Sequence, residues 1–76
     1  MNKWNIDITL KGSGIVKQCV YRGPEDNIHD VTNKIFGDKH DNYFVDLYDK
    51  NEKSIIFTRL SEIATIEVYN RKVVSV

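Results

Sequence analysis

The chain has 76 residues, of which 11 are Lys or Arg and 11 are Asp or Glu, so its formal net charge is zero. This length gives one domain, residues 1–76, whose core is marginal unless something reinforces it. The single cysteine, Cys19, excludes an internal disulfide. The balanced charge argues against duplex nucleic acid as a partner, and no apolar run approaches the roughly 20 residues that span a bilayer.

Two strands and a tight turn are predicted at the start of the chain. Residues 4–10 alternate apolar and polar side chains, which is typical of a half-buried antiparallel strand. Gly12 and Gly14 can supply the positive φ angles of a hairpin turn. Residues 15–21 then return as the second strand.

A short amphipathic helix follows this hairpin. Pro24 and the acidic pair Glu25 and Asp26 suit a first helical turn, where no amide donor is needed and the dipole favours negative charge. Apolar side chains then recur at helical spacing, at Ile28, Val31, Ile35 and Phe36. So short a helix must pack against the sheet to be stable.

Three further strands are predicted after a polar loop at residues 38–42. The third strand covers residues 43–48, and a four-residue loop joins it to the fourth at residues 54–60. The corner Ser61–Ile63 has no Gly or Pro, which favours a helical or 3₁₀ turn capped by Ser61.

Residues 64–69 form the fifth strand. A further turn is expected at Asn70–Lys72, which leaves Val73–Val76 as a short edge strand or a tail.

The predicted fold is therefore α+β, with the order β-β-α-β-β-β and one helix packed on a small, strongly curved antiparallel sheet or partly open barrel. Both faces of the third and fourth strands carry apolar side chains. On the third strand, one face carries Tyr43, Val45 and Leu47, and the other carries Phe44 and Tyr48 on either side of Asp46. On the fourth strand, Ile55 and Phe57 share one face, and Ile56 and Leu60 lie on the opposite face. One short helix covers one face only, so the other requires barrel closure or a partner chain. We therefore expect a homo-oligomer.

No catalytic residue, metal site or cofactor is predicted, and the chain is not expected to be an enzyme. The cluster His29, Asp30, Asp38, His40 and Asp41 is the best candidate for metal or acid–base chemistry, but its spacing matches no ligand motif. Cys19 lies mid-strand without a neighbouring His, and Ser61 and Glu62 are better explained as parts of a turn.

Aromatic and arginine side chains are the remaining candidates for binding. Tyr and Trp are enriched at protein interfaces, while aromatics beside Arg can also stack unpaired bases. Arg22, Arg59 and Arg71 are able to clamp a phosphate. The residues predicted to contact a ligand or partner are Arg22, Phe44, Tyr48, Arg59 and Tyr69.

Several strand and turn segments carry a resemblance that covers most of the chain: Trp4–Ile6 leading to Leu10–Gly12, then Tyr21–Pro24, then Phe57–Ala64. With these segments the chain resembles small uncharacterised phage and prophage proteins of low-GC Gram-positive bacteria. That resemblance implies a host-interaction or counter-defence protein that acts by binding. The terminal strand–turn–strand also resembles the end of an SH3-like or Sm-like small barrel, although here the helix follows the second strand.

Three functions follow as hypotheses. The first is a non-enzymatic binding protein, homo-oligomeric and with a host protein as a partner. The second is a protein that sequesters a nucleotide signal, and the third is a single-stranded nucleic-acid binder. The lone cysteine and the absence of an apolar export segment predict a cytoplasmic location, the host cytoplasm for a phage-encoded chain.

Overall fold

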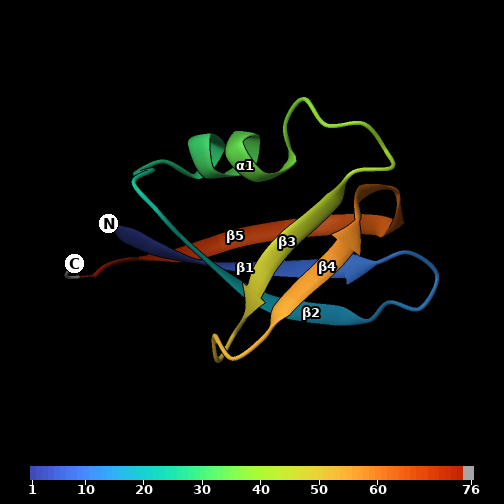
Figure 1. Cartoon of the computed structure of the whole chain (residues 1–76), viewed down its shortest axis with the longest axis horizontal. Helices are drawn as coiled ribbons and strands as arrows, with labels where there is room; N and C mark the ends of the chain where they lie inside the picture. The colour runs from blue at the N-terminus through green and yellow to red at the C-terminus, as the bar shows by residue number, and fades with distance from the viewer. Residues whose placement is uncertain (75–76) are drawn as a thin grey trace.

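The computed structural model describes residues 1–74 as one antiparallel sheet of five strands and one α-helix (Figure 1). The elements in chain order are β1 (Asn2–Leu10), β2 (Val16–Gly23), α1 (Ile28–Phe36), β3 (Phe44–Asp49), β4 (Ile55–Arg59), the 3₁₀ helix η1 (Leu60–Glu62) and β5 (Ile63–Val73). The predicted α+β class is confirmed. The predicted order is matched in part, because several bounds differ.

The strand order across the sheet is β4-β3-β2-β1-β5, with every neighbouring pair antiparallel. The edge strands β4 and β5 do not pair with each other, so the sheet does not close into a barrel. The pairing between β2 and β3 covers only Cys19 with Asp49 and Val20 with Tyr48. Because that contact is short, β3 and β4 turn away from the rest of the sheet and cross β1 and β5 diagonally (Figure 1).

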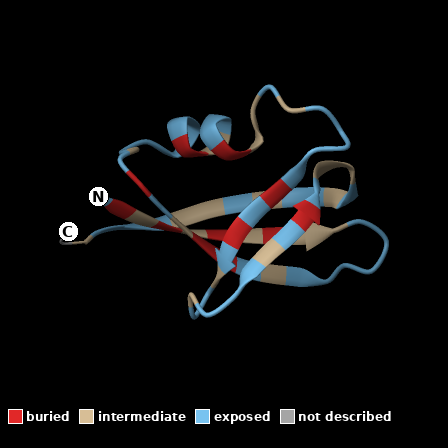
Figure 2. Cartoon of the chain, viewed as in Figure 1, coloured by how far each residue is buried: buried red, intermediate tan, exposed pale blue. Residues whose placement is uncertain are grey.

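The core lies on the inner face of this curved sheet. Along β1, Trp4, Ile6 and Ile8 are buried while the residues between them are less so, which confirms the predicted alternation. Val31 and Ile35 bring the apolar face of α1 onto the same core, and the buried part of the helix faces the sheet (Figure 2). The helix thereby covers the inner face of the sheet.

The helix begins four residues later than Pro24, so its predicted start is wrong. Asn27 is the N-cap, and its side-chain oxygen accepts a hydrogen bond from the His29 amide at 2.7 Å. The carbonyl of Glu25 instead accepts hydrogen bonds from the side chains of Asn2 and Trp4, each at 3.0 Å. Side chains of β1 therefore bind the segment before the helix, and the helix starts only beyond it.

The predicted 3₁₀ corner is present, one residue earlier than expected, at Leu60–Glu62. Ser61 lies inside the turn, and no side chain caps it, so the predicted Ser61 cap is wrong. Backbone bonds hold the corner instead: the Leu60 amide donates to the Tyr43 carbonyl at 2.8 Å, and the Lys11 amide donates to the Glu62 carbonyl at 2.9 Å. The corner is thus attached to two distant loops.

Residues 70–72 do not form the turn that the sequence suggested. They continue β5, with a register shift opposite Lys3 and Asn5 and a positive φ of 54° at Asn70. A β-bulge accommodates the extra residue while the pairing with β1 resumes. The predicted separate strand or tail at Val73–Val76 is replaced by an end of β5 at Val73, and Ser75 and Val76 lie outside the described residues.

Candidate functional site

The strands β3 and β4 form a hairpin whose two faces have different surroundings. Their cross-strand partners include Val45 with Thr58 and Leu47 with Ile56. Val45 and Leu47 are 2% and 5% exposed and belong to the core. Because partners opposite each other in an antiparallel pair point to the same side, these four residues define the inner face.

The outer face of the same hairpin carries the intervening residues. Its cross-strand pairs are Phe44 with Arg59, Asp46 with Phe57, and Tyr48 with Ile55. We call these six residues the outer patch. Phe44 and Tyr48 are each 49% exposed, Ile55 is 47% exposed and Phe57 is 63% exposed. Exposed residues therefore alternate with buried or half-buried ones along β3 and β4 (Figure 2), and the four large apolar residues of this face are among the exposed ones.

The apolar area of the outer patch is large for so small a domain. An aromatic side chain presents about 150–250 Å², so the four half-exposed apolar side chains offer roughly 400 Å² to water. The largest apolar patch of a typical monomer is about 300–600 Å² and is often functional. The outer patch is therefore the candidate binding surface.

Charged side chains in the outer patch balance each other. The Arg59 guanidinium lies 5.1 Å from the centroid of the Phe44 ring, at cation–π distance. Within residues 1–74, neither Asp46 nor Arg59 is in an ion pair with another side chain. The patch therefore has one basic and one acidic group and no net charge, and neither group has an ion-pair partner within residues 1–74.

The sequence prediction named Phe44, Tyr48 and Arg59, and the structure brings these three together in the outer patch. It did not name Asp46, Ile55 and Phe57 as contact residues. Alternation in β4 could have identified Ile55 and Phe57, since they share their side of the strand with the charged Arg59. A charge at that position marks the solvent face.

Arg22, also predicted as a contact residue, lies elsewhere and already has a partner. Its guanidinium donates to the Glu52 carboxylate through Nη2 at 3.0 Å and Nε at 3.2 Å, while Lys3 Nζ lies 3.0 Å from Glu52 Oε1. Hydrogen bonds lower the pKa of Glu52, the one from Lys3 more than the one from Arg22. The Glu52 carboxylate therefore connects the β3–β4 loop to β1 and β2.

Tyr69, the fifth predicted contact residue, lies on the outer face of β5. Its hydroxyl donates to the Asp7 carboxylate at 3.1 Å. The pKa of Tyr69 is raised, mainly by burial and to a lesser extent by this hydrogen bond. Arg71 is likewise engaged, because its Nε donates to Asn2 Oδ1 at 3.1 Å. Neither side chain joins the outer patch.

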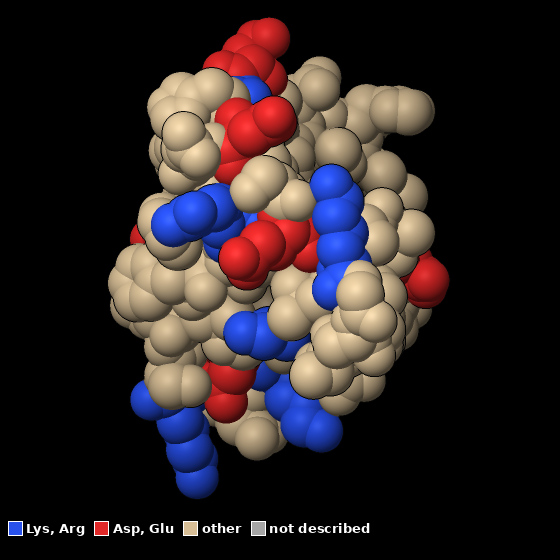
Figure 3. All heavy atoms as spheres, turned by 90° about the vertical axis from the view of Figure 1, so that its right-hand side faces the viewer, with Lys and Arg blue, Asp and Glu red and all other residues tan. Residues whose placement is uncertain are grey.

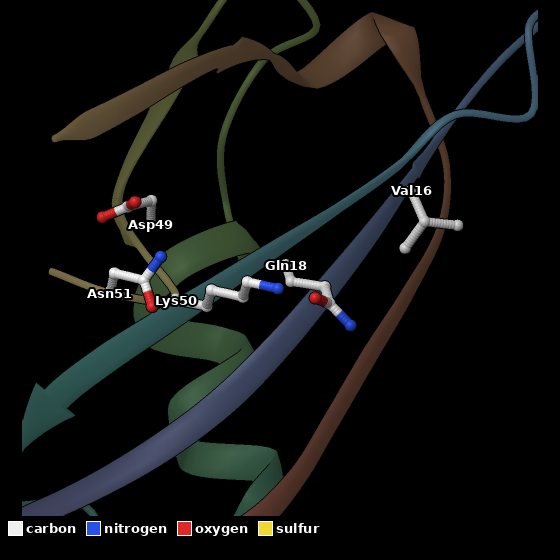
Figure 4. A pocket seen from close by; sticks show the side chains of 5 residues that line it. All are labelled: Val16, Gln18, Asp49, Lys50 and Asn51. Carbon is white, nitrogen blue, oxygen red and sulfur yellow. The ribbon is translucent and has the colours of Figure 1, made fainter. Parts of the chain in front are cut away.

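Shallow hollows also lie outside the outer patch, and two of them bear on ligand binding. One, of about 370 Å³, lies between β2 and the β3–β4 loop and is lined by Val16, Gln18, Asp49, Lys50 and Asn51 (Figure 4). There the Asp49 carboxylate accepts hydrogen bonds from the backbone amides of Lys53 at 2.7 Å and Ser54 at 3.2 Å. Hydrogen bonds from the backbone lower the pKa of Asp49, and the bond from Ser54 has the largest effect. These bonds give Asp49 a role in closing the loop.

The second hollow, of about 470 Å³, lies at the β5 bulge and is lined by Lys3, Asn5, Asn70, Arg71 and Lys72. It is basic, but Lys3 pairs with Glu52 and Arg71 bonds to Asn2 and Asp26. Lys3 and Arg71 are therefore already bonded within the chain and are not free to bind a phosphate.

Reactive groups are dispersed in the described part of the chain. Among residues 1–74, no three His, Cys, Asp or Glu side chains come together in a way that could hold a metal ion. His29 lies on α1 and His40 in the following loop, both exposed. Burial raises the pKa of the Cys19 thiol to about 11, so it stays protonated at neutral pH.

Charges of both signs are interspersed on the end of the molecule that Figure 3 displays. No helix within residues 1–74 has the length and apolar character needed to cross a bilayer. No protein-family model, curated protein or solved structure matches the chain. The resemblances to phage proteins and to SH3-like or Sm-like barrels therefore stay predictions.

Proposed function

We propose that this chain is a non-enzymatic binding protein that docks against a protein surface through the outer patch. The single observation that supports this proposal most is the exposure of four large apolar side chains side by side on β3 and β4. Burying them is favourable at about 25 cal/mol per Å² of apolar surface. Aromatic side chains and Arg are also the residue types that dominate binding energy at protein interfaces.

A protein partner agrees better with the charges than a phosphate-bearing ligand does. The outer patch has no net charge, whereas a nucleotide or duplex site needs a basic excess. Of the three arginines expected to face phosphates, Arg22 and Arg71 are hydrogen-bonded to other side chains of the same chain. Sequestering a nucleotide would first require these bonds to break.

The biological setting follows from the resemblance to phage proteins and belongs to the same proposal. A phage-encoded binding protein would act in the host cytoplasm on a host protein, as a host-interaction or counter-defence protein. The chain needs no catalytic group for this role, because occupying a partner's surface is sufficient.

Photo-crosslinking tests the proposal directly. Phe57 is replaced by the photoreactive p-benzoylphenylalanine in cells that carry the gene, and the same replacement at Thr65, on the polar outer face of β5, is the control. We expect crosslinked protein at position 57 and far less at position 65. If position 57 gives no crosslinked protein above the control, the outer patch is not a protein-binding surface.

Single-stranded nucleic acid is the second candidate, favoured by one observation. Phe44, Tyr48 and Phe57 share a strand surface with Arg59, an arrangement on which bases can stack. Asp46 in the middle of that surface would repel phosphates. Retention on an oligonucleotide column that weakens steeply with salt would support this candidate, and flow-through at low salt would exclude it.

A further inference from the structure

We infer that the partner of the outer patch is a second copy of this chain, related by a two-fold axis that pairs Arg59 of each copy with Asp46 of the other. This inference rests on the proposed function, because it names the occupant of the same surface. It is supported by the charges of the patch, by its geometry and by its area.

The charges of the outer patch are self-complementary. A two-fold interface uses the same surface on both subunits, so a contact from residue i to residue j is always repeated from j to i. The patch holds one acid and one base, and within residues 1–74 neither has an ion-pair partner. Two copies face to face would form two ion pairs, each between Asp46 of one copy and Arg59 of the other, and would leave neither charge unpaired.

The positions of Asp46 and Arg59 allow this exchange. Arg59 is the cross-strand partner of Phe44, which is two residues before Asp46 on β3. The two positions are therefore separated by about 4.8 Å across the strands and about 7 Å along them. The two-fold axis lies between the two facing sheets, parallel to them, and bisects the line from Asp46 to Arg59 at a right angle. Rotation about this axis places Arg59 of each copy opposite Asp46 of the other and makes the strands of the two copies cross at about 70°. That angle is close to the orthogonal class of sheet packing, at about 90°.

The area of the outer patch approaches the lower limit for a stable dimer. The four apolar side chains offer roughly 400 Å² and the exposed Asp46 and Arg59 add to this area, which approaches the roughly 600 Å² per copy at which stable interfaces begin. Because a chain of 76 residues buries a limited fraction of its own surface, covering this patch would also stabilise the fold by mass action.

Charge reversal tests the inference through the measured mass in solution. Wild-type protein is expected at twice the chain mass of 8.8 kDa by light scattering at micromolar concentration. D46R and R59D each place like charges opposite one another, so self-association should weaken at least ~100-fold in either variant. An equimolar mixture of D46R and R59D should form a heterodimer, because every cross-pair then joins an acid with a base. The double variant should again form a homodimer.

A matched control separates specific pairing from net charge. E67R alters an exposed acid on the outer face of β5 and changes the net charge by the same amount as D46R. It should remain a homodimer, and it should form a heterodimer with R59D more weakly than D46R does, because only one of the two cross-pairs then joins an acid with a base. Thermal unfolding of each variant verifies that it is folded.

Two results would overturn the inference. One is a wild-type chain that stays monomeric throughout the micromolar range. The other is a dimer whose single variants fail to form the heterodimer, which would place the interface elsewhere. Either result leaves the proposed function to be decided by the crosslink at position 57, since a crosslinked species of a different mass identifies another protein as the occupant.

Discussion

The outer surface of the sheet has two regions that differ in how their side chains are satisfied. Over β1 and β5, polar groups bind one another: Tyr69 donates to Asp7, and Lys3 pairs with Glu52. Over β3 and β4, the outer patch exposes apolar side chains and two charged groups that are unpaired within residues 1–74. A surface whose polar groups are already bonded gains little from a partner, whereas the outer patch still has both apolar area and charge to pair.

The largest expected effect compares the two faces of the β3–β4 hairpin itself. Leu47→Ala should lower the free energy of unfolding by about 2–5 kcal/mol, because it leaves a cavity in the core. Phe57→Ala, in the outer patch, should lower it by less than about 1 kcal/mol. Urea unfolding of dilute protein measures both. Equal losses would mean that the outer patch contributes to the fold rather than to binding.

Thr58 offers the next test, on the inner face. Its hydroxyl is buried and has no hydrogen-bond partner within the described residues. Thr58→Val replaces the hydroxyl by a methyl group of similar size, so unfolding should cost about 1 kcal/mol more than in the wild type. The same urea titration measures this. A loss of stability would show that the hydroxyl is satisfied after all.

Glu52 tests the polar side of the comparison through pH. Since its pKa is lowered in the folded state, its contribution to stability is present above the unfolded pKa, about 4.3, and disappears as pH falls through the lower folded value. Glu52→Gln should therefore lower the melting temperature at pH 7 but make little difference near pH 2. Melting curves across this range decide the point. A difference between the two proteins that did not change with pH would contradict the assigned ion pairs.

Tyr69→Phe should produce the smallest effect. It removes the hydroxyl that donates to Asp7 at the exposed outer face of β5, so a slight fall in melting temperature is expected. Self-association measured by light scattering should not change, because Tyr69 lies outside the outer patch. A clear change in self-association would mean that the two regions are not independent.

Much of the fold follows from local patterns in the sequence. The alternation in residues 4–10 identifies β1, the pair Gly12 and Gly14 provides the positive φ angles of its hairpin, at 79° and 71°, and the corner without Gly or Pro forms a 3₁₀ turn. The start of the helix is misjudged for a non-local reason. The Glu25 carbonyl is bound by side chains more than 20 residues earlier in the chain, which no local pattern reveals.

The candidate site was predicted only in part, again because contacts between residues distant in the chain cannot be read from local patterns. Phe44, Tyr48 and Arg59 belong to it, but Arg22 and Tyr69 could not be excluded from the sequence, since their acidic partners Glu52 and Asp7 are 30 and 62 residues away.

By itself the sequence determined which side chains share a face of β3 and which share a face of β4, because the alternation of a strand is a property of its own backbone. Only the tertiary structure decided which face is inside. The brief pairing of β2 with β3 turns the hairpin so that Val45 and Leu47 point to the core. The same turn leaves Phe44, Tyr48, Ile55 and Phe57 in solvent. That choice depends on register and curvature, which arise from contacts between residues distant in the chain.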